Sequence, residues 1–280
     1  MWFDHPHIRQ LVELALAEDV GTGDHATLAT IDPAKTGEAS VRAKSDAVLC
    51  GGPLFALVMA RVDPRIAVQQ LHPEGARVGP GDVVLDLQGP LGSILTAERT
   101  ALNFLQRLSG VATLTRRYAD AIAGTGARIA DTRKTLPGFR SLDKYAVRTG
   151  GGANHRTALD AGILVKENHT HAAGSVAEAV RRARTVGSHL LRVEVEVETL
   201  DDLDVALRAG AEVVLLDNMS LELLREAVRR TAGRALLEAS GNMTLERVRA
   251  VAETGVDLIS VGALTHSAVA ADFSLRLQGA

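Results

Sequence analysis

Basic residues that could bind an anion are concentrated in one segment of the chain, residues 131–156. The segment holds six lysines and arginines but two aspartates, a formal charge of +4, whereas the whole chain of 280 residues has a net charge of −3. Clustered positive charge inside a cleft attracts anions, so the segment predicts an anionic ligand. The basic residues are Arg133, Lys134, Arg140, Lys144, Arg148 and Arg156.

A solvated basic face of one helix is the alternative interpretation of this segment. Pro137, Gly138 and the glycine run 150–152 argue against it, because they cannot all lie inside a single helix. The glycine run precedes His155 and Arg156 and would let the backbone approach a ligand closely, where side chains would block it.

Acidic residues alternate with valine in the stretch VEVEVE, residues 193–198. Because successive side chains of a strand point to opposite faces, Glu194, Glu196 and Glu198 share one face. Strands of a parallel barrel are normally apolar on both faces, so carboxylates there must meet a cation, a metal ion or hydroxyl groups. An exposed edge strand is the alternative. Asp217 follows an apolar run in the same way, with a helix N-cap as its alternative role.

Small residues follow two further strand-like stretches, as Ser240-Gly241-Asn242 and as Gly262-Ala263-Leu264-Thr265. Exposed backbone N–H groups near helix N-termini bind phosphate, and barrel enzymes often place such a cradle after their last strands. Glu196 and Asp217 would suit sugar hydroxyls or Mg²⁺. With basic groups left for other anions, the layout fits a phosphorylated sugar carrying a diphosphate, together with an acidic co-substrate.

The elements that must position these residues are six short apolar stretches that alternate with helical periodicity. They are residues 127–131, 163–166, 192–197, 212–217, 235–238 and 258–261. From Glu196 onwards, polar strand ends recur roughly every twenty residues, the length of one compact βα unit. Six units predict a parallel barrel that is incomplete, because eight strands close the usual one, and its chemistry should lie at the carboxyl ends of the strands.

The first part of the chain shows no such βα repeat, so we expect a separate α+β unit there. Its predicted elements are a helix at 7–19 that ends at Gly21 and Gly23, strands at 37–48 and 66–70, a hairpin at 75–84 leading into a strand at 83–87, and a helix at 96–108. We place the domain boundary between residues 110 and 111, with the barrel at 111–280 and its last residues free to pack back on the first domain.

Composition bounds the cellular setting. Cys50 is the single cysteine, so no internal disulfide can form and a reducing, cytoplasmic compartment is expected. The longest uncharged stretch, residues 47–60, is interrupted by Gly51, Gly52 and Pro53, which makes it too short and broken to span a bilayer. We expect a soluble protein with neither a membrane nor a nucleic-acid partner.

Eight motifs occur in order along nearly the whole chain. They are ERTALNFLQRLSGVAT (98–113), DTRKTLPG (131–138), KYAVRTGGGANHR (144–156), KENH (166–169), EVEVE (194–198), LLDN (215–218), EASGN (238–242) and VGALTHS (261–267). This pattern resembles the quinolinate phosphoribosyltransferases, also called carboxylating nicotinate-nucleotide pyrophosphorylases. The resemblance implies an α/β fold, in which an N-terminal α+β open sandwich is followed by an incomplete parallel (β/α) barrel. It also implies a homodimer, or a higher assembly of dimers, in which one subunit completes its partner's site.

The implied reaction is a pentosyl transfer in NAD biosynthesis. Quinolinate and 5-phosphoribosyl-1-diphosphate would react with Mg²⁺ to give nicotinate mononucleotide, diphosphate and CO₂. Matched motif by motif, the resemblance implies catalytic roles for Lys134, Lys166, Glu196 and Asp217, with the two carboxylates also binding the metal. It implies substrate binding by Arg99, Thr132, Arg133, His155, Arg156, Ser240, Gly241, Gly262 and His266.

Within that set, Arg99 would reach into the neighbouring subunit's site, and Arg133, His155 and Arg156 would hold the two quinolinate carboxylates, for which guanidinium forks are suited. Lys134 and Lys166 would neutralise diphosphate or carboxylate charge. Ser240, Gly241, Gly262 and His266 would line the 5′-phosphate pocket. For His266, a helix-capping or simply exposed histidine is the alternative.

Two departures from the family pattern stand out. GDHAT at residues 23–27 stands where the family usually shows a GD-[IVL]-T-T type sequence, and Asn242 replaces a frequent second glycine of the phosphate loop. Two other functions are therefore kept open. One is a paralogue, of the type associated with molybdenum transport, that acts on another carboxylated acceptor. The other is a non-catalytic anion-binding protein, which the charged strand ends of KENH, EVEVE and LLDN argue against.

Overall fold

The computed structural model describes residues 2–278 and forms two compact units. Unit 1 contains residues 2–116, 136–150 and 268–278, and unit 2 contains residues 117–135 and 151–267. The units are therefore interleaved along the chain, whereas the sequence pattern suggested one change near residue 110. Two segments, 136–150 and 268–278, return to unit 1, because each packs with residues that are distant in sequence.

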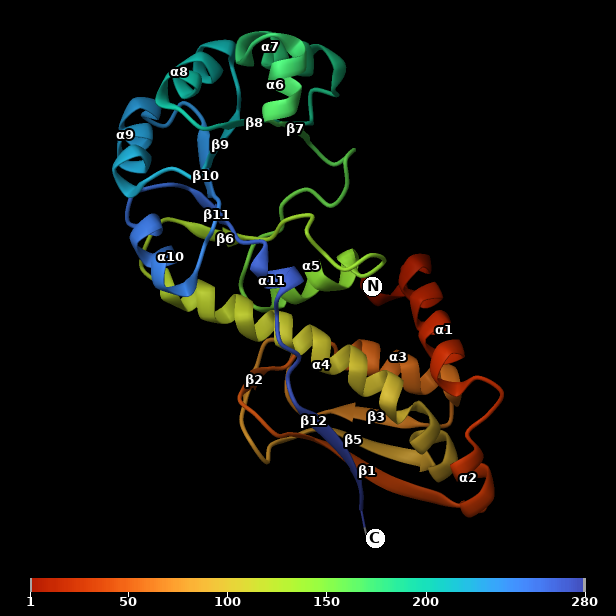
Figure 1. Cartoon of the computed structure of the whole chain (residues 1–280). Coiled ribbons are helices and arrows are strands. Elements are labelled where there is room, and N and C mark those ends of the chain that lie inside the picture. Colours follow the sequence, from red (N-terminus) through yellow and green to blue (C-terminus); the bar gives the residue numbers. More distant parts are fainter. Residues whose placement is uncertain (1, 279–280) are drawn as a thin grey trace. The chain divides into compact units, whose positions relative to one another are not determined.

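Unit 1 is built on a four-stranded antiparallel sheet with the strand order β12-β1-β5-β3 (Figure 1). Its strands are β1 (Thr36–Ala43), β3 (Ala67–Gln70), β5 (Val83–Pro90) and β12 (Phe273–Leu277). Strand β12 comes from the end of the chain and pairs with β1 from Ala43↔Phe273 to Ala39↔Leu277. A separate two-stranded ladder joins β2 (Ala47–Val48) to β4 (Arg77–Val78).

The helical segments of unit 1 are η1 (Trp2–Asp4), α1 (Pro6–Val20), α2 (His25–Thr30), α3 (Gly52–Val62), α4 (Leu91–Ala121, whose last residues belong to unit 2) and α5 (Arg140–Thr149). Helix α1 ends at Gly21, as its periodicity predicts. Helix α3 is not evident from the sequence. Gly51 caps it and Pro53 lies in its first turn, so the residues that break a membrane span here begin a helix. No helix within residues 2–278 has the length and apolar character required to cross a bilayer.

Helix α5 corrects the prediction that the whole basic segment 131–156 binds an anion. Gly138 precedes α5 and Gly150 caps it, so the glycines that argue against one long helix mark the ends of a short one. The helix carries three of the six basic residues, Arg140, Lys144 and Arg148, and belongs to unit 1. The solvated-face alternative is also wrong for Lys144, which is 1% exposed.

The first two glycines of the run 150–152 have roles in the fold. A Cβ atom on Gly150 would lie 2.5 Å from the carbonyl oxygen of Ala112 and 2.6 Å from Cβ of Thr115, so only glycine lets the end of α5 approach α4 this closely. Gly151 follows with φ of 94°, a left-handed conformation that glycine adopts without strain. The run thus turns the chain out of α5.

Unit 2 contains the six predicted parallel strands in the order β6-β11-β10-β9-β8-β7. They are β6 (Arg128–Ala130), β7 (Ile163–Val165), β8 (Val193–Val197), β9 (Val213–Asp217), β10 (Leu236–Ser240) and β11 (Leu258–Ser260). Because β6 and β7 are edges of the sheet and do not pair with each other, the barrel is open, as predicted. An isolated parallel bridge between Ala130 and Ala153 adds a short segment beyond β6.

Helices lie along the outside of this curved sheet, as Figure 1 shows for α7 to α10. The helices of unit 2 are α6 (Glu167–Ala173), α7 (Val176–Val186), α8 (Leu200–Ala209), α9 (Leu221–Thr231), α10 (Leu245–Ala252) and α11 (Ala263–His266). Helix α9 is capped by Ser220, so the alternative role of Asp217 as a helix cap is wrong. Strand β8 lies between β7 and β9, which excludes the edge-strand explanation of the VEVEVE stretch.

Strand register brings the polar positions level with one another. Glu196 of β8 and Glu238 of β10 both pair with Leu215 of the intervening strand β9. One step of the pleat further along, Asp217 pairs with Ser240. Since residues two apart on a strand share a face, these side chains point to the same side of the sheet at its carboxyl end.

Candidate active site

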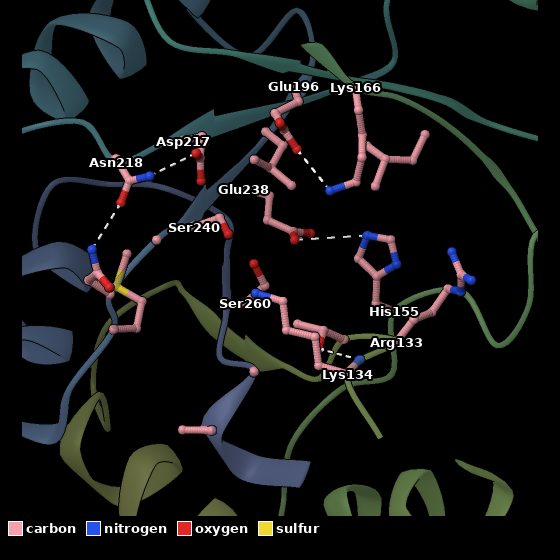
Figure 2. Close-up of a pocket in the computed structure, with 18 of the residues that line it drawn as sticks. Arg133, Lys134, His155, Lys166, Glu196, Asp217, Asn218, Glu238, Ser240 and Ser260 are labelled. Atoms are coloured by element: carbon pink, nitrogen blue, oxygen red, sulfur yellow. Dashed lines mark hydrogen bonds and ion pairs between the residues drawn. The ribbon is translucent and has the colours of Figure 1, made fainter. Parts of the chain in front are cut away.

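A cavity of about 800 Å³ opens at the carboxyl ends of the parallel strands in unit 2 (Figure 2). Twelve of the thirteen residues implied by the sequence resemblance line it: Thr132, Arg133, Lys134, His155, Arg156, Lys166, Glu196, Asp217, Ser240, Gly241, Gly262 and His266. The exception is Arg99, an exposed residue of α4 in unit 1. Residues spread over 135 positions of sequence therefore meet at one place.

Asp131 holds together the two segments that carry the basic groups. Its carboxylate is fully buried after β6 and accepts a hydrogen bond from Asn154 Nδ2 at 2.6 Å and from the backbone N–H of His155 at 2.9 Å. Thr265 Oγ1 donates to the carbonyl of Lys134 at 2.7 Å and secures the same loop from the side of α11. Asp131 is thus a structural anchor that fixes where Arg133 and His155 project.

Arg133 and Arg156 bring two guanidinium groups to the cavity. Arg156 donates from Nη1 to the carbonyl of Gly162 at 3.0 Å, but the buried Nε atoms of both arginines have no hydrogen-bond partner among residues 2–278. Burial, and then the charge of Arg133, lower the pKa of Arg156. A buried donor without an acceptor is costly, so this pair is built for an anionic ligand.

His155 is engaged at both ring nitrogens. Nδ1 accepts the backbone N–H of Arg156 at 2.7 Å, and Nε2 lies 2.9 Å from Oε2 of Glu194. Because Nδ1 acts as the acceptor, the ring proton is on Nε2, which donates to the carboxylate. Oε1 of Glu238 lies 3.9 Å from the same Nε2. We call Arg133, Arg156, His155, Glu194 and Glu238 the cationic end of the site.

Glu238 has the most perturbed acidity of this group. Its side chain is 2% exposed, and burial, followed by the neighbouring charge of Glu194, raises its pKa from the ordinary 4.5 to about 7. His155 and a hydrogen bond from Ser260 act in the opposite direction but are weaker. A carboxyl group that is half protonated near neutral pH therefore lies beside the cavity.

Lys166 and Glu196 form an ion pair at the mouth of the strands, with Nζ 3.2 Å from Oε2 (Figure 2). Lys166 is the N-cap residue of α6, and its backbone N–H donates to Nδ1 of His169 at 2.9 Å. The histidine of the KENH motif therefore fixes the start of the helix, while the lysine and the carboxylate face the cavity. The side chain of Glu196 is only 16% exposed, which keeps this pair in a defined place.

Backbone and amide groups dominate the opposite side of the cavity. Asn218 Nδ2 donates to Asp217 Oδ2 at 2.8 Å, and Asn242 Nδ2 lies 3.4 Å from Asn218 Oδ1. Glycine is required at position 241 for two reasons. Its φ of 93° is left-handed, and a Cβ atom there would clash with Asn218 Oδ1. We call Asp217, Asn218, Ser240, Gly241 and Asn242 the small-residue end. Figure 2 shows Asp217 and Asn218 on its left, away from Arg133 and His155.

Two sets of side chains could hold a divalent ion by residue type. Glu196 and Asp217 offer carboxylate oxygens to the same cavity, which fits Mg²⁺, an ion commonly bound by one or two carboxylates plus substrate phosphates. His155, Glu194 and Glu238 also lie within 4.8 Å of one another. However, the nitrogen of His155 that faces the carboxylates carries the ring proton, so it cannot coordinate a metal without losing its bond to Arg156. The second set does not fit a metal.

Sequence reasoning did not single out Glu194, Glu238 or Asn218 as site residues. The period-two pattern did place Glu194 on the face of Glu196, and the EASGN motif begins with Glu238. What the pattern could not give is the register, which sets Glu238 beside His155, a residue 83 positions earlier in the chain.

Comparison with known proteins agrees with this geometry. Residues 24–109 match the family model "Quinolinate phosphoribosyl transferase, N-terminal domain", and residues 111–276 match the model of the C-terminal domain. The chain belongs to the quinolinate phosphoribosyltransferase family. The boundary between the two matches lies inside α4.

Relatives of the quinolinate phosphoribosyltransferase family match over nearly the full chain. A Bacillus subtilis protein named a probable carboxylating nicotinate-nucleotide pyrophosphorylase is 39% identical over 272 residues, 97% of this chain and 94% of its own. Decarboxylating quinolinate phosphoribosyltransferase 1 of Nicotiana glauca is 41% identical and covers 98% of this chain and 83% of its own. The solved nicotinate-nucleotide pyrophosphorylase of Francisella tularensis superposes with a TM-score of 0.94 at 42% identity, covering 97% and 96% of the two chains.

Proposed function

We propose that this protein transfers a phosphoribosyl group from 5-phosphoribosyl-1-diphosphate to quinolinate, with loss of CO₂. The products are nicotinate mononucleotide and diphosphate, which places the reaction in NAD biosynthesis. Family membership and the named relatives support this assignment. The observation that carries it is the pair Arg133 and Arg156, which line the same cavity as Glu196 and Asp217 and whose buried Nε groups have no acceptor in the described part of the chain.

The cationic end is the proposed place for quinolinate. A dicarboxylate supplies acceptors for both guanidinium groups, and planar forks match carboxylate geometry. A monocarboxylate would leave one buried donor unmet, which costs roughly 1 to 3 kcal/mol. Since both ring nitrogens of His155 are engaged by protein groups, we assign this residue the task of fixing the backbone of Arg156.

The small-residue end is the proposed place for the 5′-phosphate. The loops after β10 and β11 present Ser240, Gly241 and Gly262 to the cavity, and His266 lies on its rim. A Cβ atom on Gly262 would lie 3.1 Å from Cδ of Lys134, so glycine at this position keeps room for the lysine. Backbone N–H groups in such loops bind phosphate without a large side chain.

Glu196, together with Asp217 of the small-residue end, would bind the ribose hydroxyls and Mg²⁺. When bound, the ion would neutralise the charge that develops on the diphosphate as it leaves. Lys134 and Lys166 supply fixed positive charge to the same cavity, and the pairing of Lys166 with Glu196 holds its ammonium group in place before substrate arrives. Preorganised charge of this kind is commonly the largest contribution to catalysis.

The chemistry needs no strong base from the protein. The pyridine nitrogen of quinolinate forms a bond to the anomeric carbon of the ribose as the bond from that carbon to the diphosphate oxygen breaks. The bond from ring carbon 2 to its carboxylate then breaks and leaves its electron pair on carbon 2, where the adjacent pyridinium nitrogen stabilises it, and carbon 2 uses this pair to take a proton from solvent. Release of CO₂ removes the carboxylate from the cationic end.

Formation of nicotinate mononucleotide from the two substrates and Mg²⁺ tests the proposal. The wild-type protein should form product, Arg133→Ala should form almost none, and Arg133→Lys should retain a small fraction because it keeps the charge and loses the fork. Absence of product from the wild type with quinolinate, alongside turnover of another carboxylated acceptor, would favour the paralogue instead.

We also propose a homodimer in which Arg99 of one subunit enters the site of its partner. The support is that Arg99 is exposed on α4 and absent from the residues that line the cavity of its own chain. Arg99→Ala and Arg133→Ala dimers should each be nearly inactive, and mixing them should restore activity through hybrid dimers with one intact site. No recovery after verified subunit exchange would contradict a shared site.

A cytoplasmic location is proposed from the single buried Cys50.

A further inference from the structure

Two carboxylates are buried next to each other at the cationic end. Glu194 of β8 is 8% exposed and Glu238 of β10 is 2% exposed. Oε1 of each has no hydrogen-bond partner among residues 2–278. Burying even one unpaired charge is unfavourable, so two adjacent carboxylates are expected to share a proton or to need a nearby cation.

The Nε2 atom of His155 faces both carboxylates, and Figure 2 shows its link to Glu238. Its ring cannot supply the missing proton by becoming a cation, because Nδ1 already accepts the backbone N–H of Arg156. Its Nε2 proton is directed to Glu194 at 2.9 Å, whereas Glu238 lies at 3.9 Å. The closer carboxylate, Glu194, receives the ring proton, so we take Glu238 as the member of the trio that changes protonation.

The surroundings of Glu238 set the direction of that change. The groups that face it are Glu194 from β8, His155 from the segment after α5, Asp131 after β6, Ser260 from β11 and the apolar Leu215 from β9. Burial and the charge of Glu194 raise the pKa of Glu238 to about 7, and Asp131 acts in the same direction. Arg133 and Arg156 line the same cavity and attract a dianion to it.

We propose that Glu238 takes up one proton from solvent when a dicarboxylate acceptor binds beside Arg133 and Arg156. Two negative charges added beside Glu194 make the ionised form of Glu238 still less favourable, and the proton forms an O–H bond on the carboxylate of Glu238. The protein thereby adjusts the charge of the cationic end to its ligand. A monocarboxylate adds half the charge and draws less proton uptake, so Glu238 contributes to acceptor specificity. The inference rests on the proposed function, since quinolinate is the dianion concerned.

Because ligand binding is coupled to proton uptake by Glu238, the affinity for quinolinate should depend on pH. At pH 6, about one unit below its pKa of about 7, Glu238 is mostly protonated in the free protein, so binding takes up almost no proton and the affinity depends little on pH. Above pH 7 the proton must be captured on binding, and affinity falls by up to about tenfold per pH unit. Quinolinate itself stays fully ionised over this range, because carboxyl groups titrate near pH 4 or lower.

Calorimetry of quinolinate binding to the intact protein tests the inference. At pH 8, titrations in HEPES and in Tris, which differ in ionisation enthalpy, should report uptake of roughly 0.9 proton per site, because about nine-tenths of a group with pKa 7 is ionised there. At pH 6 the uptake should be close to zero. Uptake at pH 8 that is close to zero would overturn the inference while leaving quinolinate binding, and the proposed function, intact.

Glu238→Gln keeps the shape of the side chain and removes its titration. This variant should take up no proton at pH 8, and its affinity for quinolinate should be level from pH 6 to pH 8. The matched control is Glu253→Gln, which removes an exposed carboxylate paired with Arg249 and should behave as wild type. Uptake that persists in Glu238→Gln would overturn the assignment to Glu238. Wild-type protein that binds no quinolinate at either pH would count against the proposed function itself.

Glu194→Gln gives a second test that does not depend on the first variant. Removing the charge of Glu194 should lower the pKa of Glu238. The affinity for quinolinate should then begin to fall at a lower pH than in the wild type. The proton uptake at pH 6 should then exceed that of the wild type. An unchanged pH profile would show that the two carboxylates are not coupled and would overturn the proposed mechanism.

Discussion

The two ends of the cavity are built on opposite principles. The cationic end consists of buried charged side chains, several of whose polar atoms have no partner within residues 2–278. The small-residue end consists of backbone, a left-handed glycine and exposed amides whose hydrogen bonds are already made. At the cationic end, a ligand can supply partners for buried polar atoms that have none. At the small-residue end, the absence of large side chains leaves room for a ligand. Substitutions should therefore act through lost charge at one end and through steric conflict at the other.

The largest effect is expected from Arg156→Ala. Truncating one member of a buried, charge-assisted contact costs about 2 to 5 kcal/mol, so affinity for quinolinate should fall by about thirtyfold or more. Nicotinate binding should change far less, because a monocarboxylate needs only one of the two forks. Calorimetry with both ligands measures the difference, and Arg156→Lys separates the fork from the charge. Equal weakening of both ligands would contradict the dicarboxylate assignment.

A comparable effect on stability is expected at Glu238. Its pKa is raised from 4.5 to about 7, so the folded protein binds more protons than the unfolded chain between these values. Its contribution is therefore fully present below pH 4.5 and is lost as pH rises through 7. Glu238→Gln has no such titration. The unfolding free energy of the variant minus that of the wild type should therefore be about 3 kcal/mol larger at pH 8 than at pH 4.5. Urea unfolding at both pH values measures the gain, and a constant difference would show that the carboxyl group titrates normally.

At the small-residue end, Gly241→Ala should act sterically. The added Cβ would clash with Asn218 Oδ1, and φ of 93° strains any other residue by about 1 to 3 kcal/mol. We expect the KM for 5-phosphoribosyl-1-diphosphate to rise by about tenfold, with quinolinate affinity nearly unchanged. Gly124→Ala is the matched control, because Gly124 has φ of 80° and open space around it. If the control raises the KM equally, backbone strain alone explains the effect.

The smallest effect is expected from Asn242→Gly, which restores the residue usual in the family. The side chain makes one long hydrogen bond of 3.4 Å to Asn218, and glycine adopts φ of 45° at least as readily as asparagine. The KM for 5-phosphoribosyl-1-diphosphate should change by less than about threefold, which corresponds to roughly 0.6 kcal/mol. A larger loss would mean that the amide chain through Asn218 positions Asp217.

Much of unit 2 could be predicted from the sequence. Its short strands are bounded by polar residues and glycines, and local hydrophobicity is sufficient to mark them. Unit 1 was less predictable. Helix α3 has a capping Gly51 and an early Pro53, which look like breaks in the pattern until the helix is known to begin there. The return of β12 to β1 depends on pairing across more than 230 residues, which no local pattern records.

The residue types at the strand ends, and the motifs that carry them, could be recognised without a structure, because short apolar runs and period-two alternation are local properties. It could not decide which of these charged residues would be buried or meet. The middle of the basic segment forms the amphipathic helix α5, and Lys144 is buried on the side of this helix that packs against the rest of unit 1. The contact of Glu238 with His155 came from strand register and from the anchor at Asp131. Burial and the neighbouring charge of Glu194 raise the pKa of Glu238 to about 7, and both depend on residues that are distant from Glu238 in the sequence.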